Sequence, residues 1–194
     1  DGKITSANFS PDGRHIVTGS EDKTAKIYGE GEDESWTEKS TMYHDTAVNS
    51  AEFSPDGRHM STICLGGTAK IYGMGKGEEG KWTEEVSIYH NSAIKSLNFS
   101  GNGSHVVVTF GDGTAKIYGR GEDKNWTEKA FISGNSHDSK VDSAIFSPDG
   151  RHMVVIFQDG KARIYGKGMG EDKNWTEKAT IQHDYRIVSA TFSA

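Results

Sequence analysis

Short runs in which apolar and polar residues alternate follow one another along the whole chain, with a turn signal roughly every ten residues. The first cycle holds four such runs, at residues 4–9, 15–18, 24–28 and 36–42. Alternation with a period of two, in segments rich in β-branched and aromatic residues, predicts β-strands. The turn Ser10-Pro11-Asp12-Gly13 separates the first two runs and allows the chain to reverse. No stretch keeps apolar residues at helical spacing, so the chain is predicted to be all-β, with four short antiparallel strands in each cycle.

The cycle occurs four times. Ile-Tyr-Gly stands at residues 27–29, 71–73, 117–119 and 164–166, and a tryptophan follows each copy ahead of Thr-Glu, at Trp36, Trp82, Trp126 and Trp175. A fixed period of 44 to 47 residues indicates one supersecondary unit repeated along the chain. We expect a single region over residues 1–194, with repeats at about 1–45, 46–91, 92–138 and 139–184. Within the remaining residues 185–194, Ile187 to Phe192 repeats the first strand once more, which predicts an extra inner strand.

The first strand of each repeat has apolar residues at recurrent positions, which in the first copy are Ile4, Ala7 and Phe9. Ile4 and Ala7 are an odd number of residues apart, so a regular strand would point them to opposite faces of the sheet. Both faces then need cover. A ring of radially arranged sheets covers both faces of every copy.

These residues resemble the WD40 repeat. Val48 to Gly57 is similar to the innermost strand and following turn of that family, Thr18 to Tyr28 is similar to its second and third strands, and His44 resembles the histidine ahead of each blade. The resemblance covers essentially the whole chain and implies a β-propeller of four-stranded antiparallel blades. Identical stretches at Glu122 to Ala130 and Glu171 to Ala179 suggest recent duplication within one gene or an engineered repeat protein.

The resemblance also implies a buried network in each blade, built from a histidine, a loop aspartate, a strand hydroxyl and the tryptophan of Trp-Asp. Here Tyr-Gly replaces Trp-Asp in every copy, and Gly66 replaces the aspartate of the second copy. We therefore expect a histidine–aspartate hydrogen bond in some blades and mainly packing in others. The positions that match this structural network are His44, His90, His137, His183, Asp22, Asp112 and Asp159.

The sequence alone allows three ways in which the ring could close, because both ends of the chain supply the same inner strand. The chain forms part of a larger propeller, pairs with a second copy into an eight-blade homodimer, or closes on itself with four blades. An unpaired edge strand favours self-association.

Composition narrows the classes of partner. The net charge of −6 is spread over mixed clusters without a basic stripe, which argues against nucleic acid. A single cysteine, Cys64, excludes an internal disulfide and is expected to lie in a strand as a small apolar residue. No apolar run is long enough for a membrane span, and no signal-like segment opens the chain, which indicates the cytoplasm only weakly.

No motif predicts catalysis, a cofactor or a metal site. The recurrent histidines stand one per sheet, whereas a metal needs three or four converging ligands, and His15, His59, His105 and His152 open second strands where we expect surface residues. The acidic loops lack the spacing of a calcium loop, and Gly-x-Gly at residues 73–75 and 119–121 is not followed by a helix. No serine, cysteine or carboxylate pair stands in a nucleophile context, so we do not expect an enzyme.

The residues between the network histidine and the first strand differ from copy to copy, while the framework repeats. Loops on a rigid scaffold are common binding sites, so we expect a non-catalytic scaffold that binds a protein or peptide through these loops. Alternatives are a carbohydrate-binding propeller that uses its tryptophans or tyrosines, and an amplified or designed repeat chain whose only property is assembly. The candidate partner-binding residues are Asp45, Thr46, Asn91, Ser92, Asp138, Lys140, Asp184, Tyr185 and Arg186.

Overall fold

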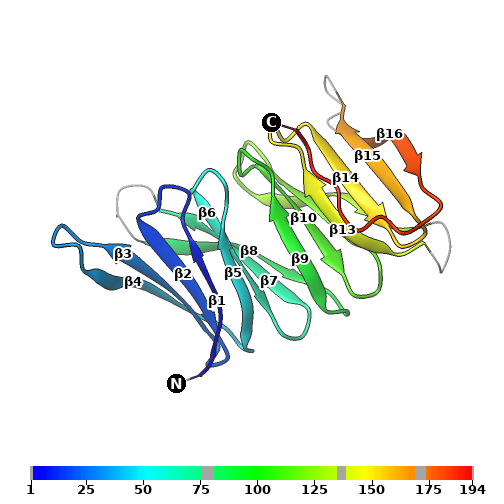
Figure 1. Cartoon of the computed structure of the whole chain (residues 1–194). Coiled ribbons are helices and arrows are strands. Elements are labelled where there is room, and N and C mark those ends of the chain that lie inside the picture. Colours follow the sequence, from blue (N-terminus) through cyan, green and yellow to red (C-terminus); the bar gives the residue numbers. More distant parts are fainter. Residues whose placement is uncertain (1, 76–80, 135–138, 169–173, 194) are drawn as a thin grey trace. The chain divides into compact units, whose positions relative to one another are not determined.

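A computed structural model describes residues 2–75, 81–134, 139–168 and 174–193 as four antiparallel sheets of four strands each (Figure 1). Each sheet is a meander in chain order, and we number the sheets 1 to 4 along the chain. The chain divides into two compact units, unit 1 with residues 1–94 and unit 2 with residues 95–194. The strands are β1 (Ile4–Phe9), β2 (His15–Ser20), β3 (Thr24–Glu30) and β4 (Trp36–Tyr43) in sheet 1; β5 (Val48–Phe53), β6 (His59–Cys64), β7 (Thr68–Met74) and β8 (Trp82–Tyr89) in sheet 2; β9 (Ile94–Phe99), β10 (His105–Phe110), β11 (Ala115–Arg120) and β12 (Trp126–Ile132) in sheet 3; and β13 (Val141–Phe146), β14 (His152–Phe157), β15 (Lys161–Lys167) and β16 (Trp175–Gln182) in sheet 4.

The turns between the first and second strands of the four sheets share one hydrogen-bond pattern. In the first copy the Ser10 hydroxyl donates to the Asp12 carboxylate at 2.5 Å and accepts from the His15 amide at 2.9 Å. Gly13 takes a φ of +73°, which a residue without a side chain adopts at little cost. The same pattern is built around Ser54, Ser100 and Ser147, so each first strand reverses into the second in the same way.

The first strand carries a β-bulge that the alternation pattern did not predict. Pairing between β5 and β6 shifts between Val48 and Ser50, and β1 and β13 show the same shift. Val48 pairs with Cys64 and Ala51 with Thr62, two residues of β6 that lie on one face. The expectation that these apolar positions point to opposite faces was therefore wrong, because the extra residue of the bulge returns both side chains to the same face.

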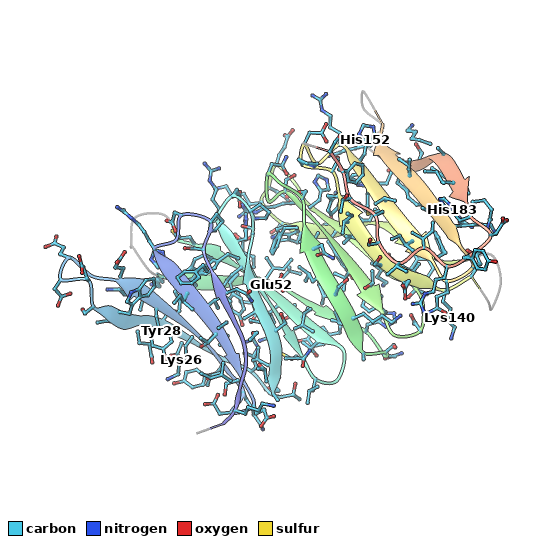
Figure 2. All side chains as sticks on the ribbon, in the orientation of Figure 1. Lys26, Tyr28, Glu52, Lys140, His152 and His183 are labelled. Carbon is cyan, nitrogen blue, oxygen red and sulfur yellow. The ribbon has the colours of Figure 1, made fainter. Side chains whose placement is uncertain are left out.

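Packing between sheets 1 and 2 forms the core of unit 1. Ala25 and Ile27 of β3 are fully buried, and they share one apolar cluster with Val48 and Ala51 of β5. Lys26 and Tyr28, the alternate positions of β3, point from the other face of sheet 1 (Figure 2). The core also contains Val17, Met42, Met60, Cys64 and Tyr72.

Sheets 3 and 4 pack through equivalent positions in unit 2. Ala115 and Ile117 take the places of Ala25 and Ile27, and Val141 and Ala144 take those of Val48 and Ala51. Other members of this cluster are Val107, Ile132, Met153, Val155, Phe157 and Trp175. Polar side chains join neighbouring inner strands in both units, because Asn8 donates to the Ala51 carbonyl at 2.9 Å and Asn98 donates to the Ala144 carbonyl at 3.1 Å.

The predicted extra inner strand is not formed within the described residues. The segment from Ile187 to Phe192 has no strand assignment, although its sequence repeats that of β1. A strand needs a neighbour to satisfy its backbone groups, and no described strand pairs with this segment. It lies instead against apolar residues of sheet 4, where it lines a cavity together with Val154, Ala162, Ile164 and Ile181.

Candidate functional site

The candidate loops are held at both ends by backbone hydrogen bonds. In the loop between β4 and β5, the His44 amide donates to the Lys23 carbonyl at 2.9 Å, and the Ala47 carbonyl accepts from the Leu65 amide at 3.0 Å. The loop is thus tied to the β2–β3 turn of its own sheet and to the β6–β7 turn of the next. The loop after β8 begins in the same way, with a bond from the His90 amide to the Gly67 carbonyl. Such anchoring fixes the loop backbone and leaves side chains at its tip free to face solvent.

In unit 1 the predicted residues are mainly exposed. Asp45, Thr46 and Asn91 are exposed and Ser92 is half-buried. Thr46 donates through its hydroxyl to the Leu65 carbonyl at 2.7 Å, and the Ser92 amide donates to Nδ1 of His90 at 3.1 Å.

In unit 2 the last loop brings three predicted residues together. Asp184, Tyr185 and Arg186 line a pocket of about 340 Å³, and Tyr185 is 86% exposed. Arg186 donates to the Asp142 carboxylate at 2.8 Å, which ties this loop to β13. Lys140 is half-buried just ahead of β13 (Figure 2), whereas the predicted residues His137 and Asp138 lie outside the described part of the chain.

Three exposed apolar residues beside the unit 1 loops were not predicted. Tyr43 and Tyr89 are 77% and 70% exposed at the last positions of β4 and β8, and Leu65 is 59% exposed in the β6–β7 turn. Tyrosine is frequent among the residues that dominate binding energy. The sequence signal was present, because both tyrosines stand directly before a network histidine, but only the structure shows that their side chains are uncovered.

Packing mainly holds His44, the network histidine ahead of sheet 2, in place. His44 is buried and stacks edge-on against Tyr72, with ring centroids 6.1 Å apart, and its Nδ1 lies 3.4 Å from the Cys64 sulfur. Burial, with a smaller effect from the charge of Lys70, lowers the pKa of His44 to about 4. This arrangement occurs where Gly66 replaces the usual aspartate, and Cys64 lies buried in a strand as predicted.

The network aspartates make contacts within their own turns. The carboxylates of Asp22, Asp112 and Asp159 accept hydrogen bonds within their own turns, from Thr24, Thr114 and Lys161. His183, directly after β16, is exposed (Figure 2).

The histidines that open second strands differ from the prediction of surface residues. His59 and His105 are buried, His15 is half-buried, and only His152 is exposed. His105 is covered by the next sheet, because its ring packs against Phe146 and Trp175 with centroids 6.4 and 5.8 Å away.

Three of the four tryptophans pack against neighbouring residues. Trp126 and Trp175 are each 7% exposed, and Trp82 stacks against Phe53 with ring centroids 5.7 Å apart, whereas Trp36 is 39% exposed. Sugar stacking needs an open ring face, so the burial of these three rings does not favour a carbohydrate site built on the repeated tryptophans.

Among the described residues, no group of three or more histidine, cysteine or acidic side chains could hold a metal ion. The described chain also contains no helix with the length and apolar character of a membrane span.

Four antiparallel meander sheets of four strands, packed in pairs within each unit through equivalent positions, define the chain as a β-propeller protein. The family model for the WD domain, G-beta repeat, matches residues 1–29, 36–73 and 84–119, which is more than half of the chain. The chain belongs to the WD40 repeat family. Members of this family generally act as protein-interaction scaffolds rather than as enzymes. No curated protein matches the sequence.

Among solved structures, the fold is similar to the crystal structure of a protein from Lactobacillus plantarum that was a structural genomics target. The two share 16% sequence identity with a TM-score of 0.67, and the match covers 96% of this chain and 56% of the other. This similarity concerns the fold alone. The chain thus spans about half the length of the structure it matches.

Proposed function

We propose that the chain is a non-catalytic scaffold that binds a protein or peptide through the loops between outer and inner strands. One observation carries the proposal: the pocket in which Asp184, Tyr185 and Arg186 come together on a loop that an ion pair to Asp142 holds in place. A fixed loop loses little conformational entropy when a partner binds. An exposed tyrosine beside an arginine combines the two residue types most suited to a binding hot spot.

The residues of unit 1 support the same role. Tyr43, Leu65 and Tyr89 are exposed apolar side chains beside Asp45 and Asn91, in loops whose backbone is anchored. Apolar groups surrounded by polar ones are typical of surfaces that bind other proteins.

Selection of peptides from a displayed random library tests the proposal. We expect peptides selected on the native chain to bind the Tyr185→Ala variant at least about tenfold more weakly, because loss of a hot-spot side chain costs about 2 kcal/mol or more. Arg186→Ala should weaken binding as well. The matched control is Phe131→Ala, which removes another aromatic side chain of unit 2, 55% exposed, from β12 of sheet 3. Peptides that bind native chain, Tyr185→Ala and Arg186→Ala alike would refute the loop site.

We further propose that the four sheets belong to a larger ring, rather than to a homodimeric eight-blade ring or a closed four-blade ring. The matched structure, which is longer than this chain, supports this arrangement. Light scattering should then give a mass near 21.2 kDa for the isolated chain. A mass near twice that value would instead identify the eight-blade homodimer.

A further inference from the structure

A cavity of about 160 Å³ lies between the turns of sheets 1 and 2 in unit 1, at the ends of the inner strands opposite to the candidate loops. Trp82, Phe53 and Met74 supply its apolar wall. Asp12 and Asp56 supply two carboxylates, and the remaining lining residues are Ser10, Pro11, His15 and Gly57.

The equivalent place in unit 2 shows what such a cavity can hold. Met74 pairs across the strands with Trp82, and Lys167 pairs in the same way with Trp175. The Lys167 ammonium lies 3.1 Å from Nε2 of His105, whose ring packs against Trp175. An ammonium group from within the chain therefore occupies, in unit 2, the place next to the histidine that stays open in unit 1.

Burial supports this assignment of donor and acceptor in unit 2. Burial, together with the charges of Lys167 and Lys129, lowers the pKa of His105 to about 4, so the ring is neutral near pH 7 and accepts from the lysine. His15, the matching residue of unit 1, is only half-buried.

The charges that line the two places also differ. At the position of Asp12 in unit 1, unit 2 has the neutral Asn102. Unit 2 also has the ammonium of Lys167, for which unit 1 has Met74. Hydrogen bonds from Ser10 and the Arg14 amide lower the pKa of Asp12, which keeps this carboxylate ionised. The Asp56 carboxylate lies 4.0 Å from Nδ1 of His59.

The residues that line the cavity include no lysine or arginine. Arg14 and Arg58, which follow the two turns, are exposed and do not line it. A lysine of the outer strand lies near the histidine in both units, Lys39 in unit 1 and Lys129 in unit 2, so it does not account for the difference.

We propose that the cavity of unit 1 binds the side chain of a lysine from a partner protein or peptide, in the place that Lys167 fills in unit 2. The aliphatic part of the lysine would contact Phe53 and Met74, and its ammonium would lie between the indole of Trp82 and the two carboxylates. Aromatic faces and carboxylates both attract such a cation. This site goes beyond the loop site proposed above and is independent of it, because it lies at the other ends of the strands.

The test uses the peptide acetyl-Gly-Lys-Gly-amide, with acetyl-Gly-norleucine-Gly-amide as the uncharged control. Binding is followed by NMR through the indole N–H signal of Trp82, assigned with Trp82→Phe. We expect a saturable shift with the lysine peptide, at least fivefold weaker affinity in high salt, and no saturable shift with the norleucine peptide. Equal responses to both peptides would show that the charge is not recognised and would overturn the proposal.

Two sets of variants test the site from opposite directions. Met74→Lys places an ammonium in the cavity as in unit 2 and should abolish the shift, although the fold tolerates lysine at the matching position. Asp12→Asn with Asp56→Asn should weaken binding at least fivefold without disturbing the turns, because Asn102 makes the same turn contacts from its amide oxygen. If Met74→Lys binds the peptide as well as the native chain does, the site lies elsewhere.

The reverse exchange should create a site in unit 2. Lys167→Met together with Asn102→Asp removes the internal ammonium and restores the second carboxylate, so the lysine peptide should now shift the Trp175 signal as well. If the lysine peptide does not shift the Trp175 signal of this variant, the proposed lysine site is contradicted. A negative result in these cavity experiments would not affect the peptide selection with Tyr185→Ala, because Tyr185 belongs to the separate loop site.

Discussion

Replacing Phe157 by alanine is expected to lower the free energy of unfolding of unit 2 by about 3–5 kcal/mol, the range found when a buried aromatic side chain is truncated. Phe157 is fully buried in the cluster between sheets 3 and 4. The Arg163 guanidinium carbon lies 4.5 Å from the centre of its ring, so truncation also removes a cation–π contact from a buried arginine.

Urea unfolding followed by tryptophan fluorescence measures this loss, since Trp175 belongs to the same cluster. Phe131→Ala is the control and should change stability by less than about 0.5 kcal/mol, because Phe131 is 55% exposed. A loss below 1 kcal/mol in Phe157→Ala would mean that sheets 3 and 4 do not pack as described.

The strands could be predicted from sequence because local signals and the repeat agree at each position. Alternation marks the strands, Ser10 to Gly13 and its later copies mark the reversals, and four copies remove the ambiguity that one short strand would leave. The bulge between Val48 and Ser50 could not be predicted in this way, since neither glycine nor proline marks it. Its signal is indirect: Val48 and Ala51 are both apolar although their spacing is odd.

Pairing and burial could not be predicted for single positions, because they depend on neighbours that are distant in sequence. The sequence of Ile187 to Phe192 is that of an inner strand, yet no described strand pairs with it. His105 looks like a turn residue until Phe146 and Trp175 of the next sheet cover it.

The candidate site was predictable to a similar extent. Variation between copies indicated the loops that carry Asp45 and Tyr185, whereas it could not show that Tyr43 and Tyr89 are exposed. The exchange of Met74 for Lys167 is visible in the sequence. The effect of this exchange could not be predicted, because the Lys167 ammonium lies beside His105, a residue of another sheet.

The second large effect concerns pH. We expect the stability of both units to fall as the pH falls from about 6.5 to about 4, because burial lowers the pKa of His44 in unit 1 and of His105 in unit 2 to about 4. In the unfolded chain these histidines have a pKa near 6.5 and take up protons below it. The unfolded state therefore binds more protons in this window, and protons favour it.

The slope follows from the same linkage. Between its pKa in the folded chain and its pKa in the unfolded chain, each histidine changes the free energy of unfolding by up to about 1.4 kcal/mol per pH unit. Above the pKa of the unfolded chain it contributes no pH dependence. Carboxylates with lowered pKa values, such as Asp12 and Asp149, lose their contribution only at lower pH, as they become protonated. Measurements at pH 7.5, 5.5 and 4.5 therefore report mainly on the histidines.

Urea unfolding of the double variant His44→Gln and His105→Gln separates this cause from others. Glutamine does not titrate, so the slope between pH 6.5 and 4.5 should fall even if the variant is less stable at every pH. His183→Gln replaces an exposed histidine and serves as the control variant. An unchanged slope in the double variant would contradict the burial of both rings. Since each histidine lies in a different unit, either single variant should flatten the pH dependence of its own unit alone, which ties the effect to packing between neighbouring sheets rather than to the net charge of the chain.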